Sequence, residues 1–158
     1  MRSDRLGRAM RGADAFEGAA FLGLSKRSKR DPYRLGLFAA HLDPEERPLV
    51  FLAIQGGTLV VTDRRVLEFR AHLEVHGAWN VKEFQGYEIR RNLDRAAILG
   101  TDHRVAPTAA GPTGMLEDSV LLRLGDRTET VIVSRGPETT LSDEDFEILR
   151  SALAGQAK

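Results

Sequence analysis

The residues from Gly56 to Phe69 constrain the fold of this 158-residue chain more than any other segment. An apolar run, residues 49–54, leads into Gln55-Gly56-Gly57, and a second apolar run follows at residues 58–62. Glycine supplies the positive φ that a tight hairpin turn needs. The short length of both runs and the turn residues between them favour strands over helices. The segment therefore predicts a β-hairpin.

A third strand is predicted directly after this hairpin. Asp63-Arg64 is typical of a tight turn, and residues 65–73 follow it. Every second residue of that run is apolar, whereas the intervening residues are mainly polar. The apolar set is Leu67, Phe69, Ala71 and Leu73. Such alternation is expected of an antiparallel strand with one face on the core.

The rest of the chain adds strands, a long loop and helices. Further strands are predicted at residues 81–89, 95–100, 119–124 and 129–134, the last two joined by a turn at 125–127. Phe84, Tyr87 and Ile89 are core candidates, as is Trp79 in a turn at 77–80. Residues 101–118 contain two prolines and two glycines and predict an extended loop.

Three helices are expected. Residues 141–157 carry an apolar stripe, and Ser142 with Asp145 three residues later is typical of a helix N-terminus. Residues 33–42 carry apolar side chains on one side. Residues 14–24 place Phe16, Ala20 and Leu24 at helical spacing, although Gly18 and Gly23 weaken that helix.

Composition narrows the functional classes. The chain has 23 Lys and Arg residues against 23 Asp and Glu residues, and this balance disfavours a dedicated nucleic-acid binder. It has no cysteine, which excludes disulfides, thiolate metal sites and a cysteine nucleophile. No apolar run approaches the roughly 20 residues that cross a bilayer. We therefore expect a cytoplasmic protein, with peripheral contact to the inner membrane face as an alternative.

The segment Gly57-Thr-Leu-Val-Val-Thr-Asp-Arg-Arg-Val-Leu67 resembles the hairpin of bacterial pleckstrin-homology-like (PH-like) domains. The acidic turn and apolar strand before it, from Leu42 to Phe51, also fit the start of such domains. The resemblance covers residues 35–154. It implies a seven-stranded antiparallel sandwich or partly open barrel capped by one helix. We accordingly divide the chain into a basic extension, residues 1–34, partly helical or disordered, and a PH-like domain, residues 35–158.

The same resemblance implies a binding or assembly module and not an enzyme. We also expect no cofactor and no bound metal. Many bacterial PH-like domains form homo-oligomers, so a protein partner or a second copy is the expected partner. Phosphoinositide-binding relatives carry basic residues around the first hairpin loop, whereas Gln55-Gly56-Gly57 has none. Because a multiply charged headgroup needs several charged donors together, specific phosphoinositide binding is not expected.

Basic side chains suggest one alternative function. Lys26, Arg27, Lys29 and Arg30 form a basic run in the N-terminal extension. At an anionic membrane each would contribute about 1 kcal/mol, and the run could instead contact phosphates of a nucleic acid or remain a solvated arm. Arg64 and Arg65 could contact an anionic surface, but local ion pairing is the favoured interpretation.

Two histidine-containing patterns have a chemical interpretation and a simpler one. His72, Glu74 and His76 would share one strand face and could bind zinc, but a solvated outer face is the favoured interpretation. Asp102-His103 could serve a small enzyme built on the 101–118 loop. Catalysis needs a third group and a pocket, and the sequence indicates neither.

Overall fold

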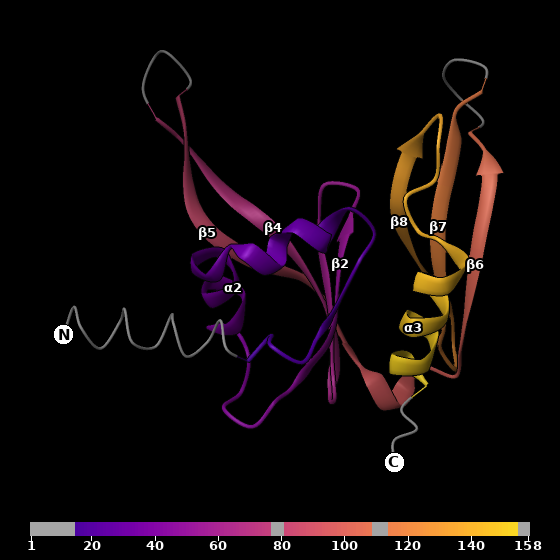
Figure 1. The fold of residues 1–158 in the computed structure, drawn as a ribbon, viewed down its shortest axis with the longest axis horizontal. Helices are drawn as coiled ribbons and strands as arrows, with labels where there is room; N and C mark the ends of the chain where they lie inside the picture. The colour runs from indigo at the N-terminus through magenta and orange to yellow at the C-terminus, as the bar shows by residue number, and fades with distance from the viewer. Residues whose placement is uncertain (1–14, 77–80, 109–113, 155–158) are drawn as a thin grey trace.

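The computed structural model describes residues 15–76, 81–108 and 114–154, without the side chains of residues 27–30, 32, 74–76, 81 and 82. Within these ranges the chain forms a five-stranded sheet, a three-stranded sheet and a C-terminal helix (Figure 1). The predicted mainly β fold with a C-terminal helix is therefore confirmed. The two sheets do not close into a barrel within the described residues.

The larger sheet has the strand order β1-β2-β3-β4-β5. Its strands are β1 (Ala20–Leu22), β2 (Pro48–Ile54), β3 (Gly57–Thr62), β4 (Arg65–His76) and β5 (Val81–Asp94). The short β1 pairs parallel with β2, and the other neighbours are antiparallel. Four of these strands were predicted, because each is an apolar or alternating run bounded by turn residues.

The smaller sheet is an antiparallel meander in the order β6-β7-β8. Its strands are β6 (Gly100–Pro107), β7 (Leu116–Arg123) and β8 (Thr128–Gly136). The helix α3 (Asp143–Leu153) lies across this sheet (Figure 1). As predicted, the side chain of Ser142 caps the helix by accepting the N–H of Asp145 at 3.1 Å.

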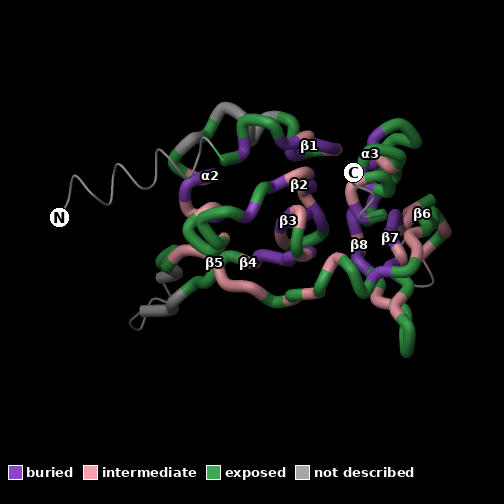
Figure 2. The backbone as a smooth tube through the Cα atoms, turned by 90° about the horizontal axis from the view of Figure 1, so that it is seen from below, coloured by how far each residue is buried: buried purple, intermediate pink, exposed green. Residues whose placement is uncertain are grey.

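Two hydrophobic clusters hold the layers together, and buried positions concentrate on the central strands (Figure 2). The first cluster lies between the two sheets and α3. It includes Leu52, Val61, Val120, Val131 and Leu149. The second lies on the other side of the five-stranded sheet, beneath α2 (Pro32–Ala39), a helix that the sequence predicted. It includes Phe16, Phe38, Phe51, Leu67 and Phe69.

The β2–β3 hairpin has the tight turn expected of its sequence. Ile54 pairs with Gly57, which leaves Gln55 and Gly56 as the loop. Of the two glycines, only Gly56 adopts a positive φ, +74°. Gly57 is required for a different reason, since a Cβ atom there would lie 2.5 Å from the carbonyl oxygen of Phe69.

The predicted helix at residues 14–24 is wrong over its described part. Residues 15–18 form a turn, β1 follows, and the 3-10 helix η1 (Gly23–Arg30) begins at Gly23, whose φ is +58°. Phe16 is buried, but Leu24 is 71% exposed, so the two do not share a helical face. Gly18 and Gly23 lie on either side of β1 and disfavour a helix there. The weak helical spacing therefore does not prevail over strand pairing with β2.

The middle of the chain also differs from its prediction. A strand was expected at residues 95–100, but this segment begins with the 3-10 helix η2 (Arg95–Ala97). Asp94 caps the start of η2, because its side chain accepts the N–H of Ala96. The expected loop at 101–118 is mostly β6 and the start of β7. Polar residues in β6 concealed the strand, because an edge strand meets solvent on one side. The predicted turn at 77–80, with Trp79, lies outside the described residues.

The third strand deviates from simple alternation. Val66 and Glu68 are as buried as Leu67 and Phe69, because both faces of this part of β4 are covered. Ala71 and Leu73, predicted to face the core, are exposed. The first part of β4 is therefore buried on both faces, whereas the face predicted to be buried is exposed in its last part.

Polar contacts join the two sheets at one seam. The N–H of Gln55, in the β2–β3 turn, donates to the carbonyl of Ile132 on β8 at 2.9 Å. Arg91 on β5 donates both to the buried Glu68 at 3.0 Å and to Glu129 on β8 at 2.5 Å.

In the described part of the chain, no helix is long and apolar enough to cross a membrane.

Candidate interaction surface

A two-stranded ribbon projects from the five-stranded sheet (Figure 1). β3 pairs with β4 only between Val66 and Phe69, whereas β4 continues to His76 and stays paired with β5 throughout. Beyond Phe69, therefore, β4 and β5 have only each other as strand neighbours among the described residues. We call this extension, residues 70–76 and 81–88, the β4–β5 ribbon.

One face of the β4–β5 ribbon continues a face of the hydrophobic core. Phe69, buried in the second cluster, pairs with Ile89, and the next pairs outward are Ala71 with Tyr87 and Leu73 with Phe84. Directly paired residues of antiparallel strands project from the same face. Leu73 is 49% exposed and Phe84 is 45% exposed. Apolar side chains thus run from the core onto an uncovered surface.

The base of the ribbon is held by α2. The ring of Phe38 stacks on Tyr87 at 4.1 Å between centroids, and Tyr87 meets Phe84 edge-on at 5.1 Å. Arg34 donates from Nε to the hydroxyl of Tyr87 at 2.9 Å. Tyr87 and Ile89 pack against the second cluster as predicted, but Phe84 lies beyond the cover of the helix and is not a core residue.

The outer edge of β5 is poorly suited to accepting another strand. Gly86 has a φ of +90°, and register shifts interrupt the β4–β5 pairing at two places. Glu88 and Arg90 place an ion pair at 3.2 Å along the strand. Bulges and charges are the usual means by which proteins prevent pairing at a sheet edge. The apolar face is therefore the better candidate for contact with a partner.

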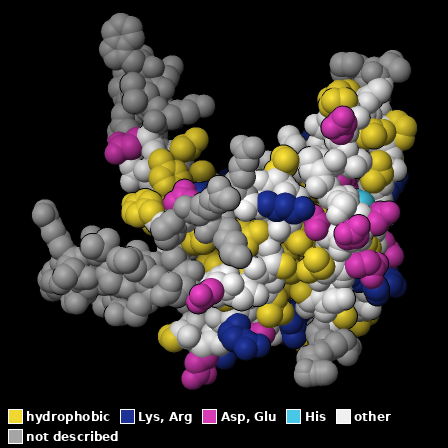
Figure 3. Space-filling view, in the orientation of Figure 1, with side chains coloured by type: hydrophobic (Ala, Val, Ile, Leu, Met, Phe, Trp, Pro, Cys, Tyr) yellow, Lys and Arg dark blue, Asp and Glu magenta, His cyan; other side chains and the backbone are white. Residues whose placement is uncertain are grey.

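Space-filling representation shows the surroundings of this face (Figure 3). Hydrophobic side chains gather at the base of the β4–β5 ribbon and again over the three-stranded sheet, and the surface is hollowed between them. Exposed apolar patches are typical of interaction sites.

The predicted basic run is only partly described. Lys26 is 64% exposed at its side chain and lies 3.5 Å from Asp145 of α3. The backbone of Arg27, Lys29 and Arg30 continues η1, but their side chains lie outside the described residues. Membrane contact through this run therefore stays a prediction.

The two predicted arginines of the β3–β4 turn differ in their surroundings. Arg65 makes a bidentate contact with Glu46, at 3.0 Å from Nε and 2.7 Å from Nη2. Arg64 is half-exposed and lies 3.7 Å from Asp43 and 3.6 Å from Glu45. The geometry agrees with local pairing for both, and an anionic-surface contact stays a prediction.

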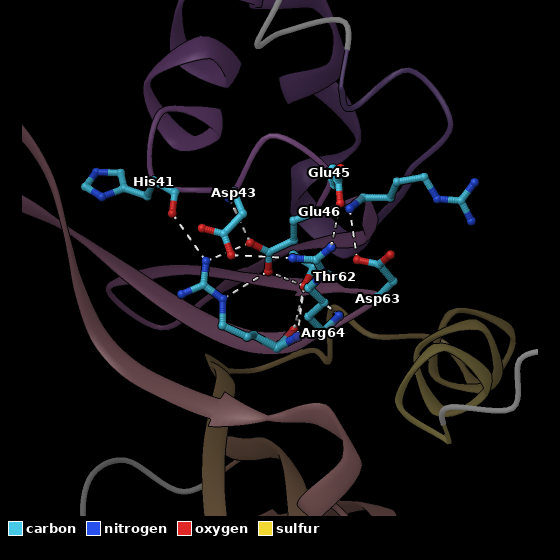
Figure 4. A network of polar contacts seen from close by, with 9 residues as sticks. His41, Asp43, Glu45, Glu46, Thr62, Asp63 and Arg64 are labelled. Atoms are coloured by element: carbon cyan, nitrogen blue, oxygen red, sulfur yellow. Dashed lines mark hydrogen bonds and ion pairs between the residues drawn. The ribbon is translucent and has the colours of Figure 1, made fainter.

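Glu46 is the centre of this polar network (Figure 4). Its carboxylate is buried and also accepts the hydroxyl of Thr62 at 2.5 Å and the N–H of Asp43 at 3.1 Å. Burial raises the pKa of Glu46, but the hydrogen bonds from Arg65, Thr62 and Asp43, with the charge of Arg65, outweigh it and lower the pKa to about 2. The network anchors the turn before β2 to the β3–β4 hairpin.

Asp102 and His103 do not act as a pair, because adjacent strand residues face opposite ways. Asp102 lies 3.3 Å from Arg123, whereas Nε2 of His103 lies 2.5 Å from a carboxylate oxygen of Asp118 on β7. Asp118 is fully buried and also accepts the N–H of Leu141.

Sequence reasoning missed the role of Asp118. The available signal was its position two residues before Val120, on the core-facing side of an apolar strand. Phe146 of α3 stacks on the ring of His103 at 5.0 Å. The pair therefore joins β6, β7 and the start of α3, which is a structural arrangement.

The proposed metal pattern is described only in part. His72 is exposed, and the side chains of Glu74 and His76 lie outside the described residues. Among the described side chains, no group of three or more acidic or histidine residues is placed to hold a metal ion.

Two clefts lie where η2 meets the end of α3, with volumes of about 460 and 350 Å³. Both are bordered by Ile98 and Ala154. Their charged groups are already engaged: Arg95, for example, donates to the carbonyl of Ala152 at 3.2 Å. Arg64, which the sequence suggested as a possible anionic-surface contact, borders the 460 Å³ cleft, but neither cleft includes His103 or the ribbon.

Comparison with known proteins adds no assignment. The chain matches no protein-family model, no curated protein and no solved structure.

Proposed function

We propose that this protein is a non-catalytic binding module of PH-like type that assembles with a second copy of itself through the apolar face of the β4–β5 ribbon. The observation that carries the proposal is the half-exposed pair Leu73 and Phe84, which extends a core face beyond its covering helix. Exposed apolar surface joined to a rigid core favours docking, since little conformational freedom is lost on contact.

Charge favours a second copy as the occupant. The chain carries equal numbers of acidic and basic residues, so two copies do not repel each other at long range. Proteins with a net charge near zero also tend to associate. Close to the ribbon, Arg70 pairs with Glu68 and Arg90 pairs with Glu88, so these four charges are engaged within the chain.

The area of the apolar face indicates weak association. A fully buried aromatic side chain covers about 150–250 Å², so the half-exposed Leu73 and Phe84 offer roughly 200 Å² together. Stable interfaces bury about 800 Å² on each partner. We therefore expect a concentration-dependent dimer with micromolar or weaker affinity, not an obligate one.

The PH-like part of the proposal has its own support. The Thr-Asp-Arg-Arg segment that carries the resemblance spans the β3–β4 turn, and a C-terminal helix covers one sheet. The arrangement differs from the expected seven strands in two respects: the described residues contain a parallel β1, and they divide as five strands and three.

Sedimentation equilibrium tests the assembly. The wild type, a Leu73→Ser/Phe84→Ser variant and an Ile148→Ser control would be compared from about 1 µM to about 1 mM. Ile148 is a matched control because it is 44% exposed and lies on α3. We expect the wild type and the control to associate and the ribbon variant, with unchanged circular dichroism, to stay monomeric. A wild type that is monomeric throughout would refute the proposal, as would equal association of all three.

A further inference from the structure

A second apolar ribbon lies on the three-stranded sheet. In the β6–β7 hairpin, Val105 pairs with Asp118 and Pro107 pairs with Leu116. These positions share a face with Val120, which is part of the first core cluster. We call the outer part of this hairpin, residues 104–107 and 116–119, the β6–β7 ribbon.

The two ribbons have the same relation to their sheets. α3 covers His103 through the ring of Phe146, but Val105, two residues farther along the same face, is 46% exposed. In the same way α2 covers Tyr87, and Phe84 emerges beyond it. Each core face thus runs out from under its helix onto a ribbon.

The ribbons also lie on the same side of the molecule. Both extend in the same direction, one on each side of the β2–β3 turn (Figure 1), and the surface between them is hollowed (Figure 3). A two-fold axis through this hollow would bring the β4–β5 ribbon of each copy to the β6–β7 ribbon of the other. Such a closed arrangement makes the same contact twice.

We propose that two copies clasp in this way, so that Leu73 and Phe84 of each copy pack against Val105 and Leu116 of the other. The inference rests on the proposed function and specifies its second contact surface. Area is the reason for preferring it: one ribbon face falls well short of the surface that a stable interface buries, and the clasp adds the half-exposed Val105 and the partly buried Leu116 to the apolar surface of each copy. It also accounts for a second uncovered face, which contact between two β4–β5 ribbons would leave exposed.

The absence of cysteine in the chain permits a direct test by cross-linking. Ala71→Cys places one thiol on the exposed face of the β4–β5 ribbon, and Val105→Cys places one on the β6–β7 ribbon. The two variants, made with tags of different mass, would be mixed and oxidised. A disulfide needs Cα atoms within about 7 Å, so bond formation reports close approach.

In the clasp, the mixed disulfide between the Ala71→Cys and Val105→Cys variants should exceed both self-linked products and exceed products of an Ile148→Cys control by at least about tenfold. Self-linking of the Ala71→Cys variant as the main product would overturn the clasp in favour of contact between two β4–β5 ribbons. Mixed products no more abundant than those of the control would also overturn it.

Sedimentation equilibrium separates failure of the clasp from failure of the proposed function. A Val105→Ser/Leu116→Ser variant should associate at least about tenfold more weakly than the wild type, as the Leu73→Ser/Phe84→Ser variant should. If the Leu73→Ser/Phe84→Ser variant associates more weakly but the Val105→Ser/Leu116→Ser variant associates like the wild type, the clasp is wrong and the assembly proposal stands. If the wild type never associates, both are wrong.

Discussion

Replacing Glu46 with glutamine removes a buried charge while keeping the shape of the side chain. In the wild type the carboxylate accepts hydrogen bonds from Arg65, Thr62 and the N–H of Asp43. Burial opposes ionisation, but these donors and the charge of Arg65 lower the pKa of Glu46 from 4.5 to about 2. Each unit of pKa difference between the folded and unfolded states corresponds to about 1.4 kcal/mol. The ionised Glu46 therefore contributes about 3 kcal/mol to the free energy of unfolding.

The sign of the pH dependence follows from the lowered pKa. A carboxylate whose pKa is lower in the folded state stabilises the fold fully above its unfolded pKa of 4.5, and this contribution is lost as the pH falls towards about 2. We therefore expect Glu46→Gln to be less stable than the wild type by about 3 kcal/mol at pH 7. The gap between the two proteins should narrow steadily between pH 4.5 and pH 2.

Urea unfolding followed by circular dichroism measures this difference at each pH. Glu45→Gln is the matched control, because Glu45 is the adjacent residue, 87% of its side chain is exposed, and it lies 3.6 Å from Arg64. Exposed ion pairs contribute little, so the control should change stability by less than about 1 kcal/mol. The reasoning is refuted if Glu46→Gln and Glu45→Gln unfold alike at pH 7, or if the Glu46→Gln difference does not depend on pH.

Two further predictions concern close packing and a buried pair. Gly57→Ala should lower stability by about 1–3 kcal/mol, because the added carbon would meet the carbonyl of Phe69. Gly125→Ala is the control and should be tolerated, because a Cβ atom there has nothing within 4 Å. Thermal melts of the two variants measure the difference in stability. Asp118→Ala should cost about 2–4 kcal/mol, because it leaves a partly buried histidine and a buried N–H without their acceptor. Asp102→Ala should have little effect, and equal urea midpoints for the two aspartate variants would contradict the pairing seen here.

The sequence by itself determined the elements whose signals are local. Gly56 and Gly57 specify the β2–β3 turn through backbone conformation and close approach, and Ser142 specifies the start of α3 by capping it. These devices act within a few residues, so their pattern can be recognised in the sequence without knowledge of the fold. The apolar runs of β2 and β3 were equally recognisable, because burial on both faces requires them.

Tertiary structure decided which of these faces remain covered. Phe84 was a core candidate as an apolar residue of a predicted strand, yet the cover of α2 reaches only Tyr87 and leaves Phe84 half-exposed. The sequence allowed Asp102 and His103 only as a disfavoured catalytic pair, and it gave no sign that strand pairing brings His103 to Asp118, fifteen residues away. Alternation of apolar and polar residues indicates which side chains of a strand lie on the same face. Where a helix ends over that face, and which strand lies opposite, depends on contacts distant in sequence, and the candidate interaction surface is a consequence of those contacts.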